Sequence, residues 1–139
     1  WEEQKHITGK RKSRLDGVPK ELSALIRAHR LQQKASETGF DWTNLEPVVN
    51  KVYEEVKELE EAISSGDQKK IEEEFGDTLF SMVNLSRHLE LSSENALRKS
   101  NNKFIARFKK LEKKIARKGK RFKELTHAEM DEIWKKVKY

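Results

Sequence analysis

Glu54-Glu55-Val56-Lys57-Glu58 and, about one helix later, Glu73-Glu74-Phe75-Gly76-Asp77 are the two stretches of this chain that decide its fold. Each lies inside an apolar pattern with helical period, so each predicts a helix that presents carboxylates on one face. Like charges four residues apart within each stretch cost an isolated helix roughly 0.2–0.5 kcal/mol per pair. Two facing helices with the same cost indicate a bound divalent cation, and oxygen-only ligands favour magnesium or manganese over zinc.

The rest of the chain continues this helical pattern, and no β-type alternation or repeat competes with it. The predicted fold class is therefore all-α, an antiparallel bundle of four to five helices. Helices are expected from Pro19 to about Thr38, from Thr43 to about Ser64, from Asp67 to about Leu89, from Ser92 or Ser93 to Gly119, and after Thr126. Thr43 with Glu46, and Thr126 with Glu129, have the spacing of capping boxes.

Two apolar features lie outside a simple helical stripe. Phe80 and Val83 make the third predicted helix apolar on more than one side, which predicts burial on more than one side. In so short a chain the additional cover is expected from a second subunit, so the bundle would be completed by dimerisation. The aromatic loop Phe40-Asp41-Trp42 is interpreted as a seal over the end of the bundle.

Composition limits the remaining classes. The chain has 139 residues, 35% hydrophobic and 39% charged, which suits one helical domain rather than a disordered chain. It contains no cysteine, which excludes a disulfide framework or a thiol nucleophile and suggests the reducing cytoplasm. No apolar run approaches the ~20 residues of a membrane span. The chain begins at Trp1 rather than methionine, so we expect it to be a piece of a longer protein.

The formal net charge of +6 raises the question of a nucleic-acid partner. The basic residues concentrate in residues 10–14 and 109–123, where they are interpreted first as solvated surface. Convergence on an anionic small ligand is the next interpretation. Nucleic-acid binding comes last, because it leaves the acidic stretches unexplained.

The carboxylates can be placed by helix geometry. Glu55 and Glu58 lie about 60° apart on one helix, and Glu74 and Asp77 lie about 60° apart on the next. Because the loop between these helices is short, they should pack antiparallel, with Glu58 and Glu74 at similar heights. Four converging carboxylates would repel one another without a cation. The alternative, acidic faces that only confer solubility, stays open at this point.

These residues resemble the all-α nucleoside triphosphate pyrophosphohydrolases, and the MazG family in particular. The resemblance covers roughly residues 15 to 138. Beyond the acids it rests on the stretches 39–42, 72–80, 83–89, 101–108 and 133–138. The chain is similar to the second of the two domains of the full-length family, so residues 1–17 are expected to be a linker or arm, residues 18–139 a MazG-type domain, and a further MazG-type domain is expected before them.

The resemblance implies the site and the reaction. The implied magnesium ligands, with manganese as a substitute, are Glu55, Glu58, Glu74 and Asp77. The implied nucleotide contacts are Lys51, Glu54, Glu55, Lys70, Glu73, Asp77, Lys103, Arg107 and Trp134. The implied reaction is hydrolysis of ribo- or deoxyribonucleoside triphosphates to monophosphate and pyrophosphate by a homodimer, with broad base specificity, for housecleaning of the nucleotide pool.

Residue chemistry agrees with this set of roles. Glu54 is one of two acids left over from the ligand set, and we expect it to act as a general base or to orient a water. Lys103 and Arg107 lie one helical turn apart, so both can reach the same polyphosphate. The alternative function is a non-catalytic helical module that senses nucleotide or metal without turnover.

Overall fold

The computed structural model describes residues 12–138, and all its regular elements are helical. It divides into two compact units, a first unit up to residue 94 and a second unit from residue 95. The predicted all-α class is confirmed for the described residues, which contain five α-helices and one short 3-10 helix but no strand. Of the predicted arm, residues 1–11 lie outside the described residues.

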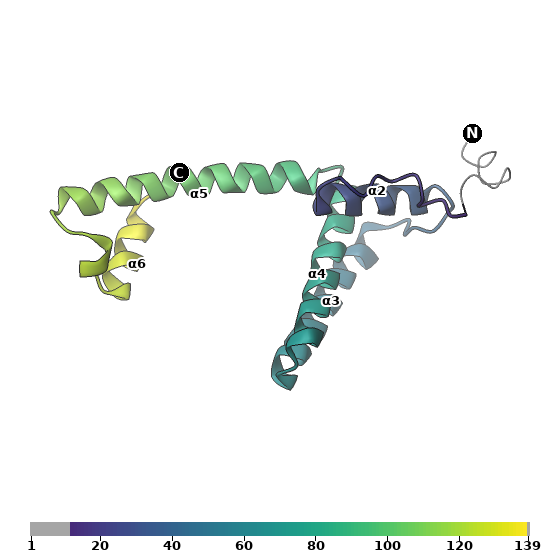
Figure 1. Cartoon of the computed structure of the whole chain (residues 1–139), viewed down its shortest axis with the longest axis horizontal. Coiled ribbons are helices and arrows are strands. Elements are labelled where there is room, and N and C mark those ends of the chain that lie inside the picture. The colour runs from purple at the N-terminus through teal and green to yellow at the C-terminus, as the bar shows by residue number, and fades with distance from the viewer. Residues whose placement is uncertain (1–11, 139) are drawn as a thin grey trace. The chain divides into compact units, whose positions relative to one another are not determined.

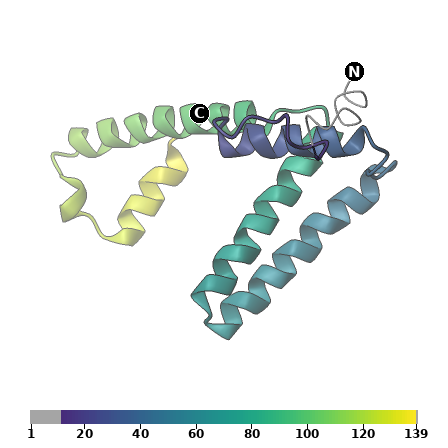
Figure 2. The same ribbon diagram turned by 45° about the vertical axis from the view of Figure 1, so that its right-hand side comes forward.

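The first unit is built on an antiparallel helical hairpin. Helix α3 (Leu45–Ser65) runs in one direction and α4 (Gln68–His88) returns beside it, with α2 (Ala24–Ser36) packed on α4 (Figures 1 and 2). Gly66 makes the turn in the left-handed conformation at φ 72°, which costs glycine little. Asp67, where this helix was predicted to begin, caps α4 by accepting hydrogen bonds from the backbone N–H groups of Lys69 and Lys70.

Two predicted helix starts are wrong. The first helix begins at Ala24 rather than Pro19, because Ser23 has an extended ψ of 150° and interrupts the helix there. The second begins at Leu45 with Asn44 as its cap, so the capping box between Thr43 and Glu46 does not form. A start at Leu45 places Pro47 at the third helical position, where it has no N–H to donate to a capping side chain.

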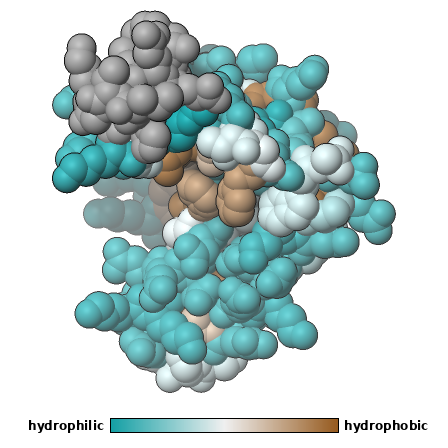
Figure 3. All heavy atoms as spheres, turned by 90° about the vertical axis from the view of Figure 1, so that its right-hand side faces the viewer, coloured by the Kyte–Doolittle hydropathy of each residue, from teal (hydrophilic) through white to brown (hydrophobic). Residues whose placement is uncertain are grey.

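The interior of the first unit is narrow. Val48, Glu55 and Ala62 are buried at seven-residue intervals along α3, and Ser81 and Val83 are buried on α4. The larger apolar residues expected inside are instead exposed in the single chain, namely Val56 and Ile63 on α3 and Phe75, Leu79, Phe80, Met82 and Leu89 on or beside α4. Figure 3 shows one face of the molecule, where apolar side chains gather within a hydrophilic surround. The hairpin alone therefore leaves much of its apolar surface uncovered.

The second unit has a separate core. Helix α5 (Ser93–Arg117) ends before Gly119, which has a φ of 67°, and the chain returns through a 3-10 turn (Phe122–Glu124) to α6 (His127–Lys136). The capping box between Thr126 and Glu129 forms as predicted. The buried residues of this unit form one apolar cluster, Leu111, Ile115, Leu125, Ile133 and Val137. Helix α6 thereby packs against the C-terminal part of α5 (Figure 2).

Candidate metal and nucleotide site

Three carboxylates from the two arms of the hairpin lie close together. Glu55 and Glu58 stand one turn apart on α3, Glu74 stands on α4, and one oxygen of each lies within 4.8 Å of the others. Thr78 joins the helices at this level, because its hydroxyl donates to the backbone carbonyl oxygens of Glu74 at 2.8 Å and Glu55 at 3.3 Å. Packing of the hairpin therefore brings together three of the four predicted metal ligands.

The acids of this cluster are incompletely paired. Glu55 is only 7% exposed, and its Oε1 lies 3.0 Å from Lys51 Nζ. The other oxygen of Glu55 and one oxygen of Glu74 are buried without a hydrogen-bond partner among the described residues. Buried carboxylate oxygens normally have partners, since leaving one unsatisfied costs about 1–3 kcal/mol or more. Two such oxygens beside a third carboxylate fit the donor set of a hard divalent cation.

The electrostatics of the cluster point the same way. The negative charge of Glu55 raises the pKa of Glu58 above its usual value, with smaller contributions from desolvation and from Glu74. Lys51 opposes this effect, and its hydrogen bond with Glu55 raises the pKa of the Lys51 ammonium in turn. Lys51 therefore relieves only part of the repulsion among the carboxylates of the cluster. The remaining repulsion favours the binding of a further cation.

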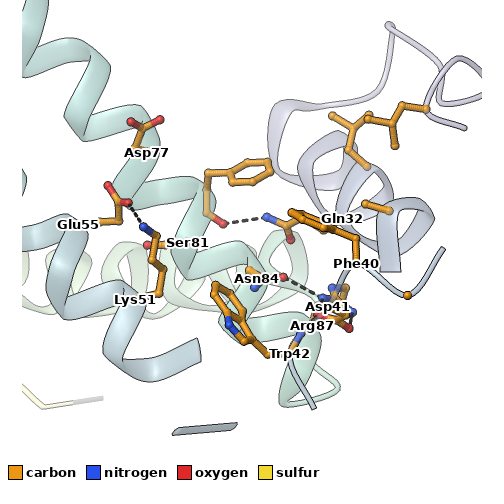
Figure 4. Close-up of a pocket in the computed structure, with 15 residues that line it drawn as sticks. Gln32, Phe40, Asp41, Trp42, Lys51, Glu55, Asp77, Ser81, Asn84 and Arg87 are labelled. Carbon is orange, nitrogen blue, oxygen red and sulfur yellow. Dashed lines mark hydrogen bonds and ion pairs between the residues drawn. The ribbon is translucent and has the colours of Figure 1, made fainter. Parts of the chain in front are cut away.

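The fourth predicted ligand lies beside this group rather than in it. Asp77 lines the same pocket as Glu55, and Figure 4 shows both carboxylates at one end of that pocket. Glu54 is exposed and lies 3.5 Å from Lys51 Nζ. Lys70 and Glu73 are exposed on the first turns of α4, whose start is fixed by the Asp67 cap.

The pocket itself has a volume of about 620 Å³. Its lining is mostly apolar and aromatic, with residues from α2, the loop after it, α3 and α4. Phe40 and Trp42 belong to this lining and are 82% and 42% exposed, so their interpretation as a seal over the bundle is wrong. An open aromatic wall next to acidic residues suggests a ligand with both an apolar and a charged part.

A polar network holds the aromatic loop against α4. The Asp41 carboxylate accepts two hydrogen bonds from Arg87, at 2.7 and 3.0 Å (Figure 4). It also lies 2.9 Å from His88 Nε2. Chiefly because of the Arg87 hydrogen bond, the pKa of Asp41 falls to about 2. Arg87 also donates to the side-chain oxygen of Asn84 at 2.9 Å. The sequence carries no signal for the contact of His88 with Asp41, because the two residues lie 47 positions apart.

The remaining predicted nucleotide contacts lie in the second unit. Lys103 and Arg107 are one turn apart on α5, as the spacing predicts. The Arg107 guanidinium donates to the carbonyl oxygens of Trp134 and Val137, both at 2.8 Å, and lies 3.9 Å from the centre of the Trp134 ring. Arg107 thus satisfies carbonyls at the C-terminal end of α6, a role that the sequence does not predict. Whether these residues also contact nucleotide stays a prediction.

None of the helices in residues 12–138 combines the length and the hydropathy that a membrane span needs.

The fold and the site define a class of protein: an all-helical domain in which a helical hairpin brings carboxylates together beside an aromatic pocket. The MazG nucleotide pyrophosphohydrolase domain matches residues 43–112, which include α3, α4 and much of α5. On that match, and on the relatives described next, the chain belongs to the MazG family.

Relatives extend the similarity over nearly the whole chain. The "Nucleoside triphosphate pyrophosphohydrolase" of Escherichia coli K12 is 46% identical over 128 residues, which are 91% of this chain and 49% of that protein. The "Nucleoside triphosphate pyrophosphohydrolase/pyrophosphatase MazG" of Thermotoga maritima is 47% identical over 140 residues, 99% of this chain and 54% of that protein. "Uncharacterized protein YabN" of Bacillus subtilis is 36% identical over 127 residues, 26% of its length. The chain thus spans about half the length of the two named pyrophosphohydrolases.

Proposed function

We propose that this domain hydrolyses nucleoside triphosphates to nucleoside monophosphate and pyrophosphate with magnesium as its cofactor. The observation that carries the proposal is the cluster of Glu55, Glu58 and Glu74, with two buried carboxylate oxygens left unpaired. The names of the relatives from Escherichia coli and Thermotoga maritima support the reaction class. We further propose broad base specificity and a housecleaning role in the nucleotide pool, as the resemblance implies.

The ion would be held by Glu55, Glu58, Glu74 and Asp77. When bound there, magnesium would neutralise triphosphate charge and make a bound water more acidic. The protein's own groups do the remaining work. Lys51 stays protonated, because its hydrogen bond with Glu55 raises its pKa, and it offers a cation at the edge of the cluster. Glu54 has an exposed carboxylate and is the proposed general base.

Further residues of each unit are proposed as contacts with the nucleotide. Lys70 and Glu73 lie exposed on α4, four residues and one residue before Glu74 respectively. Lys103 is an exposed cation on α5, and Arg107 and Trp134 form a stacked pair in the second unit. We retain these five residues as proposed nucleotide contacts.

We also propose that the domain works as a homodimer. In the single chain, Phe75, Leu79 and Met82 on α4 are each about half exposed, as are Ile63 on α3 and other large apolar residues of the hairpin. Contiguous apolar surface of this kind typically marks a protein–protein contact. A second hairpin from another subunit would bury it, which agrees with the dimerisation that the two-sided third helix predicts.

The test is pyrophosphate release from a panel of ribo- and deoxyribonucleoside triphosphates. The reaction is run with magnesium and with EDTA, on the wild type and on Glu58→Gln, Asp77→Asn and Glu72→Gln. Losing a ligand should lower kcat/KM on the order of 10³-fold, because several kcal/mol of charge stabilisation are lost. Glu72→Gln removes a charge from an exposed position on α4 outside the cluster, so its activity should equal that of the wild type.

Each outcome has a distinct meaning. Magnesium-dependent turnover that Glu58→Gln abolishes supports the enzyme. Nucleotide binding that needs magnesium but gives no pyrophosphate would replace the enzyme with a sensing module. Equal losses in Glu58→Gln and Glu72→Gln would contradict the assignment of the cluster as the metal site.

A further inference from the structure

The two units carry opposite net charges. The first unit, residues 1–94, has 14 lysines and arginines against 19 aspartates and glutamates, a formal net charge of −5. The second unit, residues 95–139, has 16 against 5, a formal net charge of +11. The acidic stretches that argue against a nucleic-acid partner all belong to the first unit. They therefore leave the surface of the second unit open to such a partner.

Much of this positive charge lies on one side of α5, which is a single helix of 25 residues (Figure 1). At about 100° per residue, seven positions between residues 99 and 117 fall within about 100° of one another round the helix. One of the seven is Ala106, and the other six are lysine or arginine and exposed. These six residues form the basic strip, namely Lys99, Lys103, Lys110, Lys113, Lys114 and Arg117.

The basic strip is long and contains no acid. From Lys99 to Arg117 it extends about 27 Å, at a rise of about 1.5 Å per residue. Its centre lies roughly 130° round α5 from the core residues Leu111 and Ile115, so the packing of α6 leaves it exposed. The two acids of α5 lie on another side, about 100° or more from every cation of the strip.

The cations of the strip also differ from other cations of the second unit in their partners. Four cations outside the strip form ion pairs, namely Lys120 with Glu129, Arg121 with Glu124, Lys135 with Asp131 and Lys136 with Glu132. Within residues 12–138, no ion pair involves the strip members Lys99, Lys110, Lys113, Lys114 and Arg117.

This arrangement is unfavourable for the isolated helix. Lys110 and Lys114 are four residues apart, as are Lys113 and Arg117, and like charges at this spacing destabilise a helix. Lys110 donates a hydrogen bond to the carbonyl oxygen of Lys138 at 2.7 Å, which leaves its charge without an acidic partner. A polyanion along the strip would relieve the repulsion over its whole length.

The chemistry of the strip excludes two kinds of polyanionic partner. A helix that lies on an anionic membrane buries its apolar side in the lipid. The apolar side of α5 carries Leu97 and Phe104, each about half exposed, and the strip faces away from it. A protein partner usually needs an aromatic or aliphatic anchor at the centre of the contact. Between its cations the strip offers only the methyl group of Ala106.

The same composition selects among nucleic acids. Proteins that hold single strands place aromatic rings between the cations for the bases to stack on, and the strip has no aromatic residue. Proteins distinguish duplex RNA through contacts with its 2′-hydroxyl groups, for which Ala106 offers no polar atom. What the strip can contact is a regular line of phosphates. Duplex DNA presents one negative charge per roughly 1.7 Å of its axis.

We infer that the second unit binds double-stranded DNA by its phosphate backbone, along the basic strip and without sequence preference. Lysines that contact phosphates position a protein on a duplex but carry no sequence information. The inference goes beyond the proposed reaction and does not depend on it. Lys103 is the one member of the strip that is also a proposed nucleotide contact, so the test leaves it unchanged.

The experiment measures binding of the full chain to a fluorescein-labelled DNA duplex of about 16 base pairs, roughly twice the length that the strip covers. Fluorescence anisotropy is recorded over a range of salt concentrations. Five to six phosphate contacts should make the logarithm of the association constant fall with the logarithm of salt concentration with a slope of about −5. The strip variant combines Lys110→Gln, Lys113→Gln, Lys114→Gln and Arg117→Gln. Its slope should be shallower by about 3.6, and its affinity at low salt should fall at least about 10-fold.

A matched control removes the same four charges from the ion-paired cations of the second unit. It combines Lys120→Gln, Arg121→Gln, Lys135→Gln and Lys136→Gln, and its slope should change by less than about 1. Glutamine has nearly the helix propensity of lysine and arginine, so both variants should fold, which far-UV circular dichroism checks. Pyrophosphate release by the strip variant should equal that of the wild type, because none of its four positions is a proposed nucleotide contact.

The outcomes separate this inference from the proposed reaction. Duplex binding that the strip variant loses and the control keeps supports the inference, whether or not pyrophosphate is released. Equal losses in the two variants would show an effect of net charge and overturn it, as would no binding of the duplex at low salt. Tighter binding of single-stranded DNA or of duplex RNA with the same sequence would overturn the choice of partner. Capture by phosphatidylserine vesicles without DNA binding would replace the duplex with a membrane surface.

Discussion

In the unit built from α2, α3 and α4, five buried side-chain atoms have no hydrogen-bond partner, whereas no such atom occurs in the described residues of the α5–α6 unit. The first unit buries Glu55 and leaves large apolar residues exposed, and the second encloses an apolar cluster. Unpaired buried groups are costly, so a fold keeps them where they serve another purpose. On the proposed function, the unpaired oxygens of Glu55 and Glu74 serve metal binding in the hairpin, whereas the buried residues of the second unit form an ordinary apolar core.

The largest effect on stability is expected in the apolar core of the second unit. Ile115 is 2% exposed on α5, so Ile115→Ala should lower the free energy of unfolding by about 2–5 kcal/mol through lost burial and a cavity. Ile105→Ala is the matched control, because Ile105 lies on the same helix and is 50% exposed. Chemical denaturation followed by far-UV circular dichroism measures both. Similar losses in the two variants would remove the distinction between core and surface in this unit.

Substitution of Arg107 tests whether this residue stabilises the packing of α6 or contacts the nucleotide. Arg107→Ala removes two hydrogen bonds to the carbonyls of Trp134 and Val137 and should destabilise the packing of α6 by about 2 kcal/mol. Arg107→Lys should recover only part of this lost stability, since the lysine ammonium lacks the planar guanidinium group that donates to both carbonyls. Arg98→Ala, also on α5 and exposed, provides the control. Weaker nucleotide binding with unchanged stability would instead support the contact that the resemblance implies.

Asp41 provides the pH test of the first unit. Its pKa in the folded chain is about 2, below the ordinary 3.8, chiefly because of the Arg87 hydrogen bond. A lowered carboxyl pKa stabilises the fold above pH 3.8, and that stability is lost as the pH falls through 3.8 toward 2. Allowing for solvent screening, Asp41→Asn should lower the free energy of unfolding by about 1 kcal/mol at pH 7 and by almost nothing near pH 2. Denaturant titrations of both proteins at the two pH values measure this. An equal cost at both would contradict the ion-pair explanation.

Local chemistry determined what could be predicted from the sequence. The capping box at Thr126 and the short loop before the helix that starts at Asp67 depend on residues a few positions apart, and these predictions are confirmed. Convergence of Glu55, Glu58 and Glu74 also follows from helical period and a short loop. The capping box at Thr43 did not form, because the helix begins at Leu45 with Asn44 as its N-cap, so Thr43 and Glu46 are no longer at the N-cap and N3 positions.

The parts that could not be predicted depend on contacts between distant segments. Asp41 finds Arg87 and His88 across 46 and 47 positions, and Gln32 finds the Phe80 carbonyl across 48. Nothing in a single sequence links such positions. Gln32 alone left a signal, a polar residue within the otherwise apolar pattern of the first helix. The pocket arises from these contacts, so its aromatic wall was misinterpreted as a seal.

The smallest predicted effect is a gain in stability rather than a loss. It tests whether the carboxylates of the hairpin form a metal site. Glu58→Gln should raise the melting temperature slightly in EDTA, because it removes a carboxylate whose pKa is raised by repulsion from Glu55 and Glu74. Magnesium should then raise the melting temperature of the wild type by binding the folded state, and should do so much less in Glu58→Gln. Differential scanning calorimetry with and without magnesium measures both changes.

Glu72→Gln distinguishes this explanation from a general effect of net charge. It removes the same charge from an exposed position on α4 outside the cluster, so it should keep the magnesium response and gain no stability in EDTA. If Glu58→Gln were instead less stable in EDTA, the carboxylates would be stabilising the hairpin through their present contacts. The unpaired oxygens of Glu55 and Glu74 would then be ordinary features of the packing, and the division between a binding hairpin and a structural second unit would fail.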